Sequence, residues 1–178
     1  MSAARLGTRK PKPRARAVTP PKAASTLRPE VFFPAIDAAT KEELFAAMVE
    51  ALARIGVAQH RGALCDALLE RERLGTTALG FGVAVPHARS MVVAETVVGF
   101  ARLRRGIDFA APDGQPVNLV FLIVGPYGAS GTAYLPVLAA IAGTVQDEAS
   151  RARLLELETF EELDRLLRFP LAAKETER

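Results

Sequence analysis

The sequence predicts a single α/β domain in which helices pack on the faces of a mixed β-sheet. Its 178 residues, 49% of them hydrophobic, suffice for one buried core of ordinary domain size. Two Thr-x-x-Glu motifs, which are typical of helix starts, flank a central block of short apolar segments that fit strands. The expected order is helix, helix, strands, helix, helix, with no internal repeat, and it favours helices packed on one sheet.

The two N-terminal helices follow from a cap and from apolar spacing. Thr40 and Glu43 form the first capping box, which satisfies free backbone N–H groups at a helix start. Apolar residues then recur at helical spacing and stop near Gly56. A second helix closes near Gly75 and has three leucines on its inward side, namely Leu64, Leu68 and Leu69.

Three apolar segments are expected as strands, at 83–85, 96–103 and 117–124. The last is a continuous apolar run, which suits a buried central strand. Residues 114–146 carry no charge, but glycines and a proline at 125–128 divide them into a strand of about eight residues and a helix of about fifteen. Neither piece reaches the roughly twenty residues of a spanning helix, so we expect no membrane insertion.

A second capping box, Thr159 with Glu162, opens the last expected helix. Leucines at 163, 166 and 167 line one side of it. This helix completes the predicted domain.

Charge divides the chain into a tail and a body. The formal net charge is +3, but residues 1–30 hold eight basic residues and one acid, and the rest of the chain is mildly acidic. We predict a disordered basic tail over 1–27, a folded domain over 28–170 and a flexible C-terminus over 171–178. The tail is either a solubilising extension or an electrostatic arm. We favour the former and expect no nucleic-acid partner, because no aromatic residue in the tail could stack on bases.

Cysteine and histidine are scarce, and this excludes several classes of site. The single cysteine, Cys65, excludes an intramolecular disulfide framework and a Cys-based zinc site, and we expect it in the core. With only His60 and His87 besides, we expect no metal and no cofactor. The basic N-terminus leads into proline rather than an apolar run, so we expect no signal peptide and a cytoplasmic protein.

The segment 70–90 carries the residues of most chemical interest. Pro86 lacks a backbone donor, so the short strand should stop there and His87 should project from a strand end. From the residues alone, His87 is either a structural hydrogen-bonding residue or a nucleophile. Gly82, Thr77 and two arginines accompany it. Glycine lets either another backbone segment or a phosphoryl group approach closely, and threonine offers a hydroxyl.

Arg71 and Arg89 flank this segment with fixed positive charge. Guanidinium groups suit phosphoryl oxygens because they donate in a planar fork. Arg89 is alternatively a solvated surface charge.

Several separated motifs resemble those of phosphotransferase-system enzyme IIA domains of the fructose/mannitol and nitrogen-regulatory type. The run Gly80–Arg89 resembles that family's phosphoacceptor motif, and Glu70-Arg71-Glu72 resembles its Arg-Glu-Glu-type element. Residues 107–109 and 112–121 are similar to its strand signature, and the helices at 134–142 and 160–167 also fit. The likeness covers about residues 30–170 and implies the fructose/mannitol-type IIA fold.

The resemblance implies that the protein is a phosphotransferase component with a phosphohistidine intermediate. His87 would accept a phosphoryl group, on its tele nitrogen, from an HPr-like phosphocarrier. It would then pass the group to a permease IIB component or hold it as a signal to a regulated target protein. Arg71, Arg89, Gly82 and Thr77 would bind the phosphoryl group. Because the chain is small and contains no permease segment, we favour a nitrogen-regulatory role over dedicated sugar uptake.

The resemblance also places Tyr134 where some family members carry a second active-site histidine. Tyrosine, with an ordinary pKa of about 10, is neutral near pH 7 but can donate a hydrogen bond to a phosphoryl oxygen. Tyr134 is alternatively a packing residue on its helix. This departure favours, as the alternative hypothesis, a degenerate IIA-fold binding module that acts without phosphorylation.

Overall fold

The computed structural model describes residues 26–127 and 134–172, without the side chains of 134–136 and 168–172. The predicted tail over 1–27 lies almost wholly outside the described residues, as does most of the predicted C-terminal segment 171–178. The elements, in chain order, are β1 (Leu27–Ile36), α1 (Lys41–Arg54), α2 (Arg61–Arg73), β2 (Ala78–Gly80), β3 (Val83–Ala84), β4 (His87–Ser90), β5 (Val97–Ile107), β6 (Val117–Pro126), α3 (Tyr134–Gln146), α4 (Glu148–Glu156) and α5 (Phe160–Ala172).

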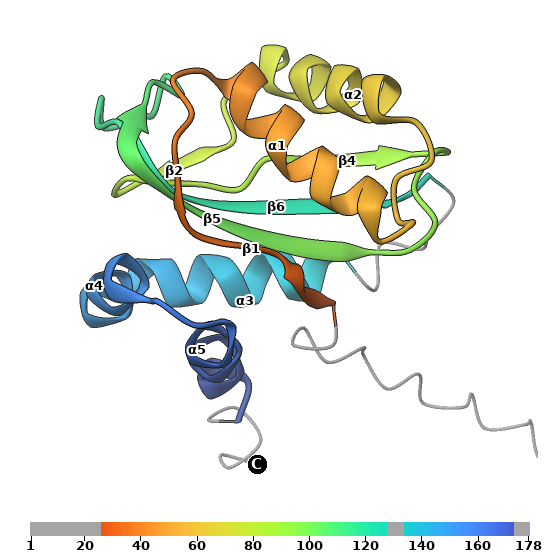
Figure 1. Cartoon of the computed structure of the whole chain (residues 1–178). Coiled ribbons are helices and arrows are strands. Elements are labelled where there is room, and N and C mark those ends of the chain that lie inside the picture. The colour runs from red at the N-terminus through yellow and green to blue at the C-terminus, as the bar shows by residue number, and fades with distance from the viewer. Residues whose placement is uncertain (1–25, 128–133, 173–178) are drawn as a thin grey trace, which may run out of the picture.

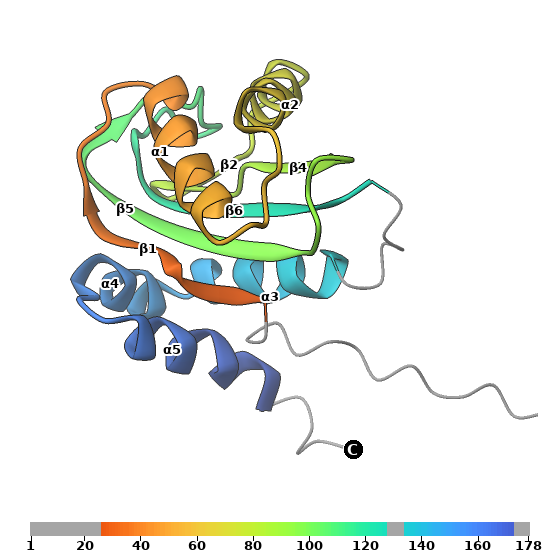
Figure 2. The same cartoon turned by 45° about the vertical axis from the view of Figure 1, so that its right-hand side comes forward.

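The six strands form one mixed sheet in the order β1-β5-β6-β3-β2, with β4 also paired to β6. β5 and β6 are antiparallel, whereas β1 runs parallel to β5, and β3 and β4 run parallel to β6. Figures 1 and 2 show α1 and α2 over one face of this sheet and α3, α4 and α5 over the other. The predicted fold class, helices on both faces of a mixed sheet, is confirmed.

β6 lies at the centre because both of its faces are apolar. Val120, Leu122 and Val124 face the core beneath α1 and α2. The alternate residues, Leu119, Phe121 and Ile123, face the core beneath α3, α4 and α5. A strand with a side-chain period of two can fill two cores only if nearly every residue is apolar, and this explains the uncharged run at 117–124.

Both predicted capping boxes are confirmed. The Thr40 hydroxyl accepts from the Glu43 N–H at 3.2 Å at the start of α1. At the start of α5, the Thr159 hydroxyl accepts from the Glu162 N–H at 3.4 Å. The Glu162 carboxylate reaches back to the Thr159 N–H at 3.1 Å, so the box is reciprocal.

Two elements correct the expected order. The fold begins with the strand β1 rather than with a helix, and this strand starts one residue before the predicted domain boundary at 28. A further helix, α4, begins after Asp147, whose carboxylate accepts from the Ser150 N–H at 2.8 Å. Within the described residues, no helix is long and apolar enough to cross a membrane.

Candidate functional site

His87 is the first residue of β4 and follows directly on Pro86. β3 and β4 pair in parallel with successive stretches of β6, and His87 lies opposite Ile123. The Pro86 carbonyl accepts from the Ile123 N–H at 2.9 Å, although Pro86 has no N–H to donate in return. The short strand stops before Pro86, as expected, since β3 ends at Ala84. The placement of His87 at a strand end is corrected: pairing resumes after the proline, and His87 lies at a strand start.

Both ring nitrogens of His87 have close partners. Nε2 is 3.0 Å from Nε of Arg71, and Nδ1 is 2.8 Å from the Val85 carbonyl oxygen. A guanidinium N–H can only donate and a carbonyl can only accept. The proton of the neutral ring is therefore on Nδ1, and the lone pair is on Nε2, facing Arg71.

The surroundings of His87 favour the neutral ring. Partial burial lowers the pKa of His87 below its ordinary value of 6.5, because it removes water from the charged form. The Val85 carbonyl opposes this shift, the positive charge of Arg71 adds to it, and the negative charge of Glu72 raises the pKa. A neutral imidazole with a lone pair on Nε2 is a nucleophile near neutral pH.

Arg71 lies in the last turn of α2, which packs beside β4. Its Nη1 donates to the Gly75 carbonyl at 2.9 Å, just after the helix ends. The guanidinium is thus held by the backbone turn as well as by the imidazole. This arrangement places a fixed positive charge beside the lone-pair nitrogen of His87.

Arg89 lies two residues after His87 on β4, so both side chains leave the same side of the strand. The two Cα positions are separated by roughly 7 Å along the strand. Arg89 is exposed and lies opposite Gly125, a residue without a side chain. The structure therefore brings Arg71, His87 and Arg89 into one region.

The other two predicted phosphoryl-binding residues lie differently. The Thr77 hydroxyl is buried and donates to Glu72 at 2.6 Å. Gly82 is in the turn between β2 and β3, with a left-handed φ of 72°. It lies five positions before His87, and five steps of extended chain span roughly 16 Å. The placement of Gly82 therefore does not support a contact with a phosphoryl group on His87.

Tyr134 is the first residue of α3, and its side chain lies outside the described part of the structure. His60, the other histidine, is the exposed N-cap residue of α2 and makes no side-chain capping bond. Cys65 is half-buried on α2 and packs against the core. Its burial raises the pKa of the thiol.

Sequence reasoning assigned no separate role to Glu72, which follows Arg71 on α2. Its carboxylate is buried and receives hydrogen bonds from the turn that precedes β2. The available signal was spacing: Leu64, Leu68 and Glu72 recur at intervals of four and form the buried side of α2. A carboxylate on such a side must have partners inside the protein.

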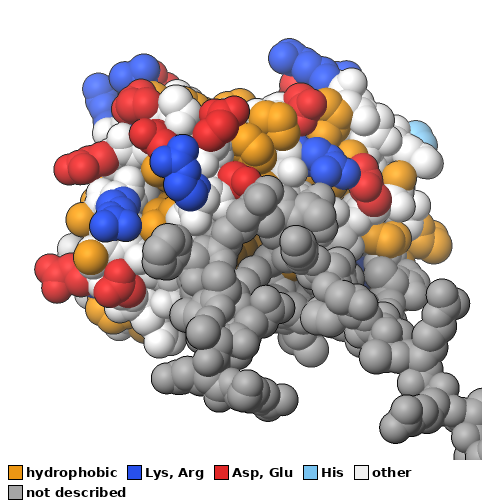
Figure 3. Space-filling model, turned by 90° about the horizontal axis from the view of Figure 1, so that it is seen from below, with side chains coloured by type: hydrophobic (Ala, Val, Ile, Leu, Met, Phe, Trp, Pro, Cys, Tyr) orange, Lys and Arg blue, Asp and Glu red, His pale blue; other side chains and the backbone are white. Residues whose placement is uncertain are grey.

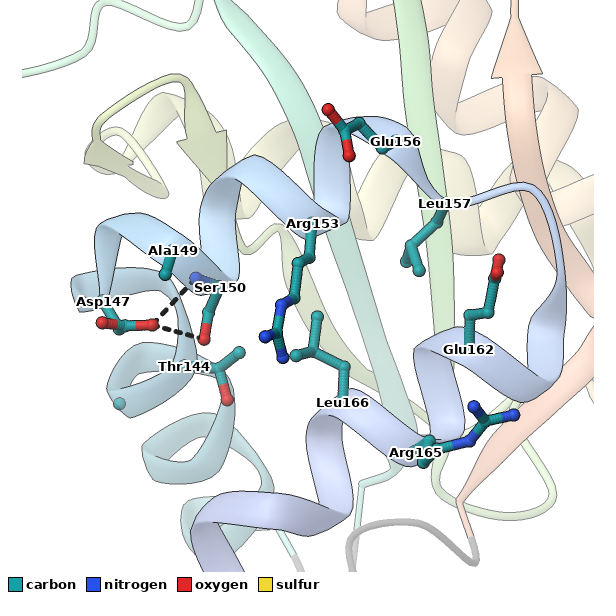
Figure 4. A pocket seen from close by; sticks show the side chains of 11 residues that line it. Thr144, Asp147, Ala149, Ser150, Arg153, Glu156, Leu157, Glu162, Arg165 and Leu166 are labelled. Atoms are coloured by element: carbon teal, nitrogen blue, oxygen red, sulfur yellow. Dashed lines mark hydrogen bonds between the residues drawn. The ribbon is translucent and has the colours of Figure 1, made fainter.

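A sizeable cavity lies away from His87. It has a volume of about 700 Å³ and lies where the end of α3 meets α4 and α5 (Figure 4). Arg153 and Arg165 line it, but so do three acids, of which Asp147 and Glu162 cap helices. Arg71 and Val85, the hydrogen-bond partners of His87 given above, are not among the residues that line it. Figure 3 shows the molecule from the side of α3, α4 and α5, and basic and acidic side chains are interspersed on the part of this face not drawn in grey.

The fold agrees with a comparison of the sequence with protein families. Residues 25–169 match the family described as "Phosphoenolpyruvate-dependent sugar phosphotransferase system, EIIA 2". The chain belongs to this family. Members are phosphotransfer components, and this class fits a nucleophilic imidazole beside a fixed cation.

Individual relatives carry two kinds of name. A "Nitrogen regulatory protein" of Bradyrhizobium diazoefficiens is 42% identical over 120 residues, 67% of this chain and 77% of that protein. A "PTS system fructose-specific EIIA component" of Haloferax volcanii is 40% identical over 121 residues, 68% and 78% of the respective chains. The crystal structure of nitrogen regulatory protein IIA-Ntr from Neisseria meningitidis has a TM-score of 0.75 and 32% identity, and the match covers 81% of this chain and 97% of that one.

Proposed function

We propose that this chain is a IIA-type regulatory phosphocarrier that accepts a phosphoryl group on His87 from the phosphohistidine of an HPr-like carrier. The single observation that carries the proposal is the neutral imidazole whose lone-pair nitrogen, Nε2, lies 3.0 Å from the guanidinium of Arg71. A nucleophile and a cation at one point are what phosphoryl transfer requires, since the protein contributes mainly position and charge.

In the proposed step, the lone pair of Nε2 attacks the phosphorus of the carrier's phosphohistidine. The new N–P bond forms as the carrier's N–P bond breaks. The carrier's ring, protonated on its other nitrogen, takes the electron pair of the broken bond and leaves as neutral imidazole. His87 keeps its Nδ1 proton, and the Val85 carbonyl, 2.8 Å away, stabilises the positive charge that the phosphorylated ring acquires.

Arg71 changes partner during this step. In the resting site its Nε–H donates to the lone pair of Nε2, and that lone pair must be released to bond phosphorus. The guanidinium then donates to a phosphoryl oxygen next to Nε2, where charge accumulates in the transition state. Arg89, on the same side of β4, is the second cation available to the phosphoryl group.

Three apolar side chains on neighbouring segments support a protein donor. Leu74 follows α2, Met91 follows β4, and Tyr127 follows β6, whose Pro126 pairs with Ser90 at the end of β4. Their exposed fractions are 79%, 86% and 71%. Exposed large apolar residues beside a reactive group favour a protein–protein contact, as transfer between two histidines requires.

We favour the nitrogen-regulatory role, in which the phosphorylated and free forms signal to a target protein. Two names support this role: a 42% identical relative and the Neisseria structure are both named nitrogen regulatory protein. Onward transfer to a permease IIB component is the sugar-uptake form of the same proposal, and the fructose-specific relative supports it. Either form places the protein in the cytoplasm, because it must share a compartment with its carrier.

The alternative is a binding module whose partner is chosen by its surface and not by phosphate. Tyrosine at position 134, where some family members have histidine, favours it. A pull-down separates the two hypotheses. If wild type and His87→Ala capture the same partner and give the same signalling output, the binding module is supported.

The direct test uses a phosphorylated HPr-like carrier and follows the label on the protein. We expect an acid-labile, base-stable phosphate on the wild type and on His60→Ala, in which the exposed histidine is removed. We expect none on His87→Ala. Absence of label on the wild type, or equal label on His87→Ala, would refute the proposal.

A further inference from the structure

Glu72 is a buried carboxylate that the proposed transfer step does not use. It is 8% exposed and lies on the inward side of α2, four residues after Leu68. Removing a carboxylate from water is unfavourable unless charges and hydrogen bonds inside the protein replace the water. The groups that contact the Glu72 carboxylate therefore indicate its role in the structure.

Those partners come from the start of α1 and from the turn between α2 and β2. Nζ of Lys41, the first residue of α1, is 3.2 Å from one carboxylate oxygen. The hydroxyl of Thr77 donates to the other oxygen at 2.6 Å, and the Thr77 N–H lies 3.2 to 3.3 Å from both. The carboxylate thus holds Thr77, in the turn at 75–77, against the end of α2 and the start of α1.

One branch of contacts runs from Glu72 to Nδ1 of His87. The Thr77 carbonyl accepts from the Val85 N–H at 3.0 Å. The Val85 carbonyl in turn accepts from Nδ1 of His87 at 2.8 Å. The position of the Val85 carbonyl, and with it the protonated nitrogen of the ring, depends on where Thr77 is held.

A second branch runs from the same turn to Nε2. The Glu72 carbonyl accepts from the Gly75 N–H at 3.2 Å, and the Gly75 carbonyl accepts from Nη1 of Arg71 at 2.9 Å. Arg71 then donates to Nε2. The turn at 75–77, which is held at its far end by the Glu72 carboxylate, therefore contacts the partners of both ring nitrogens.

We propose that Glu72 is a positioning residue: its carboxylate fixes the 75–77 turn so that His87 keeps one tautomer, with the proton on Nδ1 and the lone pair on Nε2 facing Arg71. The importance of this for phosphoryl transfer rests on the proposed function, because only a nucleophilic His87 needs a defined lone pair. Glu72 acts through Thr77, Val85 and Arg71 and touches no reacting atom.

The competing explanation is that Glu72 merely stabilises the fold through its pair with Lys41. That role predicts a loss of stability without a change at the imidazole. The charged groups that act on the pKa of His87 are Arg71 and Glu72, both from α2, and Arg89 lies two residues further along β4. A direct readout of the ring nitrogens separates the two explanations, since a purely structural role would leave their protonation unchanged in the folded protein.

The test compares Glu72→Gln with Glu70→Gln, a matched variant two residues earlier on the same helix. The Glu70 carboxylate is exposed and pairs with Arg73 at 3.2 Å. The amide of Glu72→Gln keeps one accepting oxygen and puts an NH₂ donor in place of the other, so it can no longer accept from Lys41 on one side and from Thr77 on the other. The ¹⁵N chemical shifts of the His87 ring, recorded without any phosphodonor, report the tautomer.

We expect one tautomer in the wild type and in Glu70→Gln, and a mixture in Glu72→Gln. With a phosphorylated HPr-like carrier, we expect the transfer rate of Glu72→Gln to fall by about tenfold or more. Its half-saturating carrier concentration should stay the same, because a buried residue does not contact the carrier. Wild-type ring signals in folded Glu72→Gln would overturn the inference.

Thr77→Val keeps the inference testable if Glu72→Gln does not fold. Valine has the shape of threonine but cannot donate to the carboxylate, so it too should give a tautomer mixture, and Thr77→Ser should recover the wild-type ring signals. A single tautomer in Thr77→Val would overturn the inference. A wild type that has one tautomer but accepts no phosphoryl group would refute the proposed function and leave the ring measurements to decide the role of Glu72.

Discussion

The Nε–H of Arg71 donates to Nε2 of His87 across 3.0 Å, and this contact links the last turn of α2 to the first residue of β4. It determines which ring nitrogen carries the lone pair, since the guanidinium has no acceptor atom. It also places a permanent positive charge where a phosphoryl group would arrive.

Arg71→Lys should reduce phosphorylation of His87 by about 100-fold. Arginine donates at once to Nε2 and to the Gly75 carbonyl, at 3.0 and 2.9 Å, whereas the single ammonium of lysine lacks the planar fork that spans both. Single-turnover transfer from a phosphorylated HPr-like carrier measures the rate. Arg73→Lys, an exposed residue paired with Glu70, is the control and should react like the wild type. Equal rates for the two variants would contradict the prediction.

His87 should give the protein a pH-dependent stability. Burial, and then Arg71, lower the pKa of His87 in the folded state below its ordinary 6.5. Between these two pKa values the unfolded chain binds the proton and the folded chain does not. The stability contributed by the neutral ring is therefore present above about pH 6.5 and is lost as the pH falls through the folded-state pKa.

We therefore expect the free energy of unfolding of the wild type to fall more steeply than that of His87→Asn as the pH decreases from about 7 to about 5. Urea unfolding at several pH values measures both. If the two proteins lose stability in parallel, the pKa of His87 is not lowered by folding.

Local signals were enough for the helix starts and the central strand. The Thr40 and Glu43 pair and the Thr159 and Glu162 pair act within four residues, so their sequence already contains the contact. The run at 117–124 was predictable because a strand buried on both faces must be apolar throughout.

The missed elements depend on distant partners. β1 contains Pro29 and Pro34, which argue against a regular strand, and its pairing with β5 has register shifts at two places. It forms a strand because its backbone pairs with the edge of β5, which lies some seventy residues away in the chain. α4 has nine residues of mixed polarity, so its periodicity gives a weak signal.

The candidate site also has a part that local sequence predicts and a part that depends on distant contacts. The sequence supplied His87, Arg71 and Arg89 as candidates, because their residue types and the motif around them carry the chemistry. It could not supply the contact between Arg71 and His87, sixteen residues apart, nor the hydroxyl of Thr77 turned inward to Glu72. Those depend on how the turn after α2 packs against the segment before β4.

Arg102 should contribute substantially to stability, because it links the sheet to the helix layer that contains α4. It lies on β5 with its side chain 17% exposed, and it donates to the carbonyl oxygens of Pro34 on β1 and Leu155 on α4. It also pairs with the Glu158 carboxylate at 2.6 Å.

Arg102→Met removes these donors while keeping the apolar stem, and we expect a loss of about 2 kcal/mol in the free energy of unfolding. Arg104→Met, on the same strand, removes an exposed pair with Asp37 and should change the same quantity by less than about 0.5 kcal/mol. Chemical denaturation measures both. Similar losses in the two variants would show that the contacts of Arg102 with these carbonyl groups are not needed.

Alanine substitutions at Gly99 and at Gly143 should change the stability of the fold in opposite directions. A Cβ at Gly99 on β5 would lie 2.5 Å from a side-chain carbon of Val31 and 3.2 Å from the Val31 carbonyl oxygen. The backbone of β1 cannot retreat without losing its pairing, so we expect Gly99→Ala to destabilise the fold by about 1 to 3 kcal/mol. A Cβ at Gly143 in α3 would meet no described atom within 4 Å, and alanine there should stabilise the helix by up to about 1 kcal/mol. Thermal unfolding of the two variants beside the wild type checks the signs. A higher midpoint for Gly99→Ala would mean that β1 can move away from β5, and the close approach of the edge strand would then not be what requires a glycine at this position.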